Sequence, residues 1–132
     1  MNEGRPDMAI EHTGILQIHV SVTDIERSVA FYRDVLGLRH LFTVQGQPMA
    51  FFDAVGVRLY LAVPEDERFR SRPVVYYGVA DLDDAYETAV ARGAEGISGP
   101  RLVHSDGTTE LWIAFVQDPD GTPIGLSQER LS

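Results

Sequence analysis

Several polar side chains near the N-terminus have the spacing of one strand face and could take part in chemistry. Polar and apolar residues alternate over positions 16–22, so Gln17, His19 and Ser21 should point the same way. Imidazole has a reference pKa of about 6.5, so His19 could act as a general base, or it could be a hydrogen-bonded strand histidine. Arg58 could hold a ligand carboxylate, or it could pair with an acid on the surface.

The composition excludes some kinds of chemistry and some partners. The chain has no cysteine, which excludes disulfides, thiolate metal ligands and a cysteine nucleophile. A net charge of −9 argues against nucleic acid as a partner and is compatible with a cationic small molecule or simply with a well-solvated surface. No apolar run reaches the length of a membrane span, and Met1–Ile10 lacks a signal-peptide pattern, so we expect a cytoplasmic protein that does not bind membranes.

Two helices are predicted at positions that correspond in the two halves of the chain. The first is predicted over residues 25–36, with Asp24 as its N-cap and Gly37 as its left-handed stop. The same order of cap, apolar stripe and glycine returns from Asp81 to Gly93. The chain therefore resembles one unit used twice. The apolar stripe of the first helix consists of Ile25, Val29, Tyr32 and Leu36.

Each predicted helix follows one strand and precedes three others, which gives two βαβββ modules in one domain. Neither half is large enough to bury a sufficient core alone, so the halves must share an interface or borrow one from a second copy. The tetrapeptide Asp118-Pro-Asp-Gly121 is a predicted turn. We assign residues 1–13 to a loose N-terminal extension, 14–63 to module one, 64–73 to a connector and 74–128 to module two. The strands are predicted over residues 15–22, 38–44, 49–54 and 57–63, and over 74–79, 97–104, 111–117 and 123–127.

Two motifs within this pattern resemble the vicinal-oxygen-chelate superfamily. The first runs Ser28-x-x-Phe31-Tyr32-x-x-Val35-Leu36-Gly37-Leu38, and the second is Phe115-Val-Gln-Asp-Pro-Asp-Gly121. The superfamily includes glyoxalase I, extradiol dioxygenases, fosfomycin-resistance enzymes and bleomycin-resistance binding proteins. The resemblance implies a glyoxalase-like α+β fold in which the curled mixed sheets of two βαβββ modules enclose a pocket, commonly in a dimer. We therefore expect a homodimer, with the modules paired either within one chain or between chains.

The resemblance also implies where a metal ion would be held. Metal-using members carry ligands on the first and last strands of each module, and the matching positions here are Gln17, Tyr60, Val74 and Gly125. Valine and glycine have no side-chain donor, a neutral tyrosine is a poor ligand, and a catalytic metal usually needs three protein ligands. We therefore expect no metal and no cofactor.

The pocket that the resemblance implies would be apolar and aromatic, with a few polar groups. Tyr60 and Tyr76 could donate hydrogen bonds to a ligand or stack on a ring, or could simply pack, whereas Trp112 should belong to the core. Strand alternation and the family's strand face predict that the pocket is lined by Gln17, His19, Ser21, Phe51, Arg58, Tyr60, Val74, Tyr76, Ile113, Phe115 and Gly125.

Three functions are compatible with these residues. The first is a metal-free binding protein that sequesters a small hydrophobic or cationic compound, similar to the bleomycin-resistance branch. The second is a metal-free isomerase or cyclase with His19 as its base, and the third is a metal-dependent lyase or dioxygenase. The vacant ligand positions favour the first two over the third, but a single pocket histidine serves a binding protein and an enzyme equally well.

Overall fold

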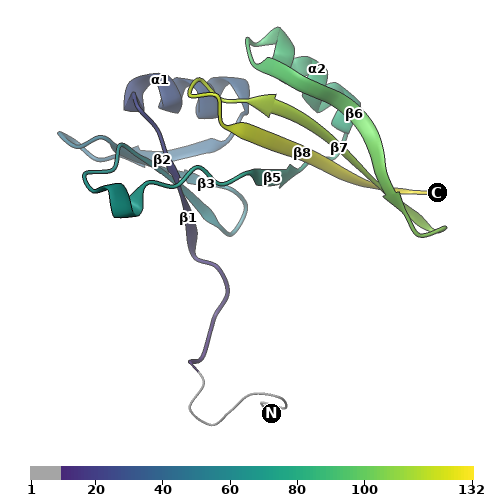
Figure 1. The fold of residues 1–132 in the computed structure, drawn as a ribbon, viewed down its shortest axis with the longest axis horizontal. Helices are drawn as coiled ribbons and strands as arrows, with labels where there is room; N and C mark the ends of the chain where they lie inside the picture. The colour runs from purple at the N-terminus through teal and green to yellow at the C-terminus, as the bar shows by residue number, and fades with distance from the viewer. Residues whose placement is uncertain (1–9) are drawn as a thin grey trace.

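The structure, a computed structural model that describes residues 10–132, contains two four-stranded sheets with the two α-helices on one side of both (Figure 1). Of the predicted N-terminal extension, residues 1–9 lie outside the described part. Module one contains β1 (Gln17–Ser21), α1 (Ile25–Ala30), the π-helix η1 (Phe31–Val35), β2 (Arg39–Thr43), β3 (Met49–Asp53) and β4 (Arg58–Ala62). The 3-10 helix η2 (Glu67–Phe69) follows, and module two contains β5 (Val75–Gly78), α2 (Leu82–Ala91), β6 (Glu95–Ser105), β7 (Thr109–Gln117) and β8 (Pro123–Leu131). The predicted α+β fold of two βαβββ modules is confirmed.

The two sheets have the same strand order. In each module the first strand lies parallel to the last, and the orders are β1-β4-β3-β2 and β5-β8-β7-β6. The register places His19 beside Tyr60 in the first sheet and Tyr76 beside Gly125 in the second. These pairs are equivalent positions of the repeated unit.

The helices begin as predicted, but the first does not stay α-helical. The side chains of Asp24 and Asp81 accept hydrogen bonds from backbone N–H groups in the first turns of α1 and α2. From Phe31 the first helix widens into a π-helix, in which the N–H of Leu36 donates to the carbonyl of Phe31 at 3.1 Å.

Strand β6 extends beyond the predicted residues 97–104 at both ends and continues through the Gly99-Pro100 pair. The strand lies at the edge of its sheet and contains register shifts on both sides of this pair. An edge strand tolerates proline because only one of its sides must form hydrogen bonds. Strand β2 also contains a register shift, between His40 and Phe42, which turns these two side chains to opposite faces of the sheet. His40 therefore contacts Phe52 on one face, and Phe42 contacts Phe51 on the other.

One hydrophobic core serves both modules, as expected for halves that share an interface. It contains buried side chains from both sheets, such as Phe52 and Leu61 from the first and Val116 and Ile124 from the second. Trp112 packs against this core as predicted, and its indole N–H donates to Glu110 at 2.9 Å. None of the helices within residues 10–132 is long and apolar enough to cross a membrane.

The predicted turn after β7 forms and connects the two modules. The N–H of Gly121 donates to the carbonyl of Asp118, and Gly121 has a φ of 80°, which glycine adopts without strain. The buried carboxylate of Asp118 accepts hydrogen bonds from the N–H groups of Asp120 and Thr122 and from the Tyr32 hydroxyl at 2.8 Å. Burial, reinforced by the charge of Asp118, raises the pKa of Tyr32 well above its usual value, so the phenol stays neutral and donates its proton.

Replacing Tyr32 with phenylalanine should lower the free energy of unfolding by about 1–3 kcal/mol, because the Asp118 carboxylate then loses a buried hydrogen bond. Urea denaturation measures the change. The matched control is Tyr86→Phe, because the half-buried Tyr86 hydroxyl has no hydrogen-bond partner among residues 10–132. Equal stability of wild type and Tyr32→Phe would show that this contact does not hold the modules together.

Candidate functional site

The helix-free face of the first sheet carries a row of four rings, one from each strand. The register brings Phe42, Phe51, Tyr60 and His19 into line across β2, β3, β4 and β1. Neighbouring ring centroids lie 4.7, 4.8 and 5.1 Å apart, and the planes of Phe51 and Tyr60 differ by only 6°. Rings at such distances form a continuous aromatic surface, which an apolar planar ligand can contact.

A guanidinium group lies beside this row of rings. Arg58 donates from Nε to the side-chain oxygen of Gln17 at 3.3 Å, and its Cζ lies 6.0 Å from the centroid of Phe51. Within residues 10–132, Arg58 forms no ion pair with a carboxylate. The guanidinium group is therefore available to bind a ligand carboxylate, and this role of Arg58 stays a prediction.

One nitrogen of the His19 ring is hydrogen-bonded within the protein, and the other is buried. Its Nε2 lies 2.9 Å from Oγ of Ser21, and that oxygen also accepts from the N–H of Ser71 at 2.8 Å. The other nitrogen, Nδ1, is buried and has no hydrogen-bond partner in the described part of the chain. A general base needs a nitrogen within hydrogen-bond reach of the substrate, so His19 would have to rearrange before it could act as one.

A cavity of about 740 Å³ lies between the first sheet and the connector. Three of the predicted residues line it, namely Gln17, His19 and Tyr60. Sequence reasoning missed the other nine lining residues. Three of them belong to the connector, which shows only charge and proline and no periodicity, and the rest lie in residues 46–49 and 62–63. The nine residues are Gly46, Gln47, Pro48, Met49, Ala62, Val63, Pro64, Glu65 and Phe69.

The second sheet carries a smaller group of the predicted residues. The rings of Tyr76 and Phe115 meet edge to face with centroids 5.7 Å apart, and Tyr76 is 53% exposed. The Tyr76 ring lies directly over Gly125, so that a Cβ atom added at Gly125 would overlap it. Val74 precedes β5 and is also exposed.

The predicted site residues thus form two groups, one on each sheet. Figure 1 shows the sheets side by side, with α1 and α2 on the same side of both, whereas the connector lies on the opposite face of the first sheet. A single pocket lined by both groups stays a prediction. The first group consists of Gln17, His19, Ser21, Phe51, Arg58 and Tyr60, and the second of Val74, Tyr76, Ile113, Phe115 and Gly125.

The residues at the four inferred ligand positions do not fit a metal ion. Gln17 and Tyr60 offer one weak neutral donor each, and Val74 offers none. At Gly125 the space that a ligand side chain would enter is filled by the Tyr76 ring. Elsewhere in residues 10–132, no group of three or more His, Asp or Glu side chains is arranged to hold a metal ion.

The sequence also matches one known family over most of its length. Residues 10–126 match the Glyoxalase/Bleomycin resistance protein/Dioxygenase superfamily. The chain belongs to this superfamily. The motifs around Phe31 and Asp118, which carried the resemblance, lie inside the matched region.

Several known proteins with different names are similar to this chain. The virulence protein STM3117 of Salmonella typhimurium is 29% identical over 117 residues, which cover 83% of this chain and 79% of that protein. The lactoylglutathione lyase of Haemophilus influenzae is 31% identical over 130 residues, which cover 88% of this chain and 93% of that enzyme. The crystal structure of TioX from Micromonospora sp. ML1 has a TM-score of 0.71 at 18% identity, covering 87% of this chain and 98% of TioX, and therefore shows the fold alone.

Replacing Gly125 with alanine should lower the free energy of unfolding by about 1–3 kcal/mol, because the new Cβ must displace the Tyr76 ring. The cost should nearly disappear in a Tyr76→Ala background, and a double-mutant cycle by urea denaturation measures the difference. Gly78→Ala is the control, since a Cβ at Gly78 would meet no atom within 4 Å. Equal costs of Gly125→Ala in both backgrounds would contradict the steric explanation.

Proposed function

We propose that this superfamily member binds a small, largely apolar or cationic planar molecule on the ring-bearing face of the first sheet, without a metal ion. The observation that carries the proposal is the row of four rings ending at His19, beside a cavity of about 740 Å³. Ligand cavities of this size usually combine apolar walls with a few polar groups. A cytoplasmic location is part of the proposal and is supported by the sequence alone.

Two enzymatic alternatives are less well supported. The similarity to a lactoylglutathione lyase favours a metal-dependent enzyme, but Val74 and Gly125 stand at two of the four positions where such members carry ligands. A metal-free enzyme would use His19 as its base, but Nε2 of that ring is hydrogen-bonded to Ser21 and Nδ1 is buried. The geometry around His19 therefore favours binding over catalysis.

Titration with acridine, followed by its fluorescence, tests the binding proposal directly. We expect saturable one-site binding that Tyr60→Ala weakens about tenfold through lost ring contact, whereas His19→Ala changes the affinity only a few fold.

Protein purified without chelator should contain well below one equivalent of Ni, Zn, Fe or Mn by mass spectrometry. One tightly held metal ion per chain would reinstate the metal-dependent alternative.

We also propose that the protein is a homodimer in which a second copy covers the open sheet faces. Apolar side chains are exposed on both helix-free faces, including Phe42, Val74 and Tyr76. Val55, at the tip of the β3–β4 turn, is 95% exposed and has a φ of 51°, which is unfavourable for a β-branched residue. It borders an apolar cleft of about 420 Å³ between the modules. Covering these groups would remove apolar surface from water and enclose the ring-bearing face.

Replacing Val74 with lysine should convert the dimer into a monomer, because a charge would then be buried against the partner's apolar face. Light scattering coupled to gel filtration measures the mass. Val90→Lys is the matched control, since Val90 is similarly exposed but lies on α2, away from the sheet faces. A monomeric wild type, or dissociation by Val90→Lys alone, would contradict this arrangement.

A further inference from the structure

Glu65 contributes one unpaired negative charge to the cavity. Of the described residues that line the cavity, Glu65 is the only one with a carboxylate, and none is a lysine or an arginine. Its carboxylate forms no ion pair or hydrogen bond with another residue in the range 10–132. The next two acids are neutralised within the connector, since Asp66 pairs with Arg68 at 2.8 Å and Glu67 with Arg70 at 3.1 Å.

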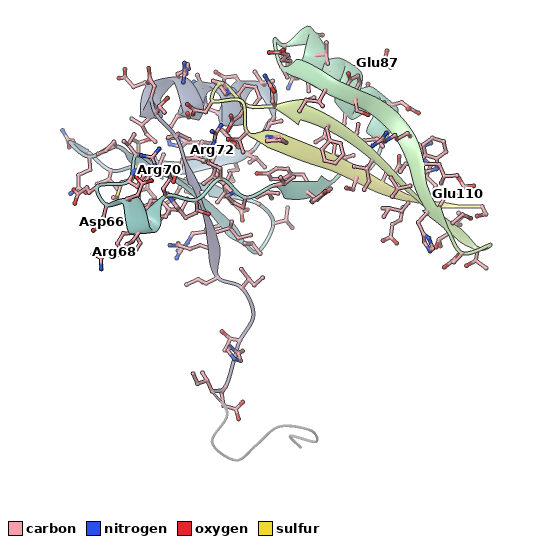
Figure 2. The ribbon with its side chains drawn as sticks, viewed as in Figure 1. Asp66, Arg68, Arg70, Arg72, Glu87 and Glu110 are labelled. Atoms are coloured by element: carbon pink, nitrogen blue, oxygen red, sulfur yellow. The ribbon has the colours of Figure 1, made fainter. Side chains whose placement is uncertain are left out.

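The connector also supplies an aromatic ring to the same cavity. Phe69 lines it from η2 and is 66% exposed, while Tyr60 lines it from the sheet. The guanidinium carbon of Arg68 lies 5.9 Å from the Phe69 centroid, so this ring already has a cation beside it. Figure 2 shows Asp66 and Arg68 at the outer turn of the connector, with Arg72 on the part that returns towards β1.

The charges around the cavity are separated along the sheet. Arg58 is held at Gln17 and does not line the cavity, whereas Glu65 lies in the segment that leaves the opposite end of β4. A cationic group on a ligand would therefore be attracted to Glu65 and kept away from Arg58. The lining rings favour the same kind of ligand, because aromatic faces attract cations.

We propose that the cavity selects a planar aromatic compound with a cationic amino group, which Glu65 binds while Tyr60 and Phe69 contact the ring. The inference rests on the proposed binding function and deepens it by naming the chemical class of the ligand. A charge-assisted hydrogen bond between the amino group and the Glu65 carboxylate supplies the selectivity, and ring contact supplies affinity that is independent of charge.

Three acridines with the same ring system but different charge test this selectivity. At pH 7.5, 9-aminoacridine is a cation, acridine is neutral and acridine-9-carboxylate is an anion. We expect 9-aminoacridine to bind about tenfold more tightly than acridine, and the carboxylate to bind least tightly. Glu65→Gln should remove the advantage of the cation and leave the affinity for acridine unchanged. Glu67→Gln is the matched control, because Glu67 does not line the cavity.

A second pair of variants checks the ring contact. Phe69→Ala should weaken 9-aminoacridine and acridine by the same factor, whereas Leu102→Ala should affect neither, because Leu102 is exposed on β6 of the second sheet and does not line the cavity. If no acridine binds, the proposed function fails. If all three bind equally and Glu65→Gln changes nothing, binding stands and charge selection by Glu65 is overturned. Tightest binding of the carboxylate would likewise overturn it.

Discussion

The structure depends on one buried carboxylate that connects the two halves of the chain. Asp118 holds its own turn through two backbone N–H groups and accepts a third hydrogen bond from Tyr32 of module one. A charge can be buried only when its hydrogen-bonding capacity is filled, so the turn and the first helix must be in place together. Beside it, Asp120 pairs with Arg27 at 3.1 Å, and Arg72 of the connector donates to Thr122 at 2.9 Å. These contacts fix the orientation of the two modules relative to each other. They therefore also fix the direction in which the sheet faces opposite α1 and α2 point.

The same arrangement gives the connector a role in the site as well as in the fold. Its end is fixed to β1, where the backbone N–H of Ser21 donates to the carbonyl of Ser71 at 2.7 Å. Arg72 fixes it to Thr122, in the turn that precedes β8. Between the end of β4 and these attachments, Glu65 and Phe69 are held over the face that carries Tyr60 and His19. A segment that links two repeated units is thus also one wall of the cavity, and the wall differs in charge from the sheet beneath it.

Local patterns were sufficient to predict the elements, and long-range pairing decided the rest. Caps, apolar periodicity and glycines located both helices and most strands, since these signals act over a few residues. The bulge in β2 that turns Phe42 towards Phe51 could not be predicted, because register depends on the partner strand. The contact between Tyr76 and Gly125 also depends on a pairing, that of β5 with β8. The part played by Phe69 was missed because an irregular segment gives no periodicity from which to infer its direction.

The Tyr76 ring over Gly125 has a consequence for how this chain could change during evolution. An acidic side chain cannot enter position 125 while the ring occupies that space, and removing the ring first uncovers a glycine in a strand. Each single step therefore loses packing before it could gain a metal ligand, and Val74 would still lack a donor. A carboxylate ligand at position 125 would therefore require coordinated changes at 76 and 125, and a donor at position 74 as well, rather than one substitution.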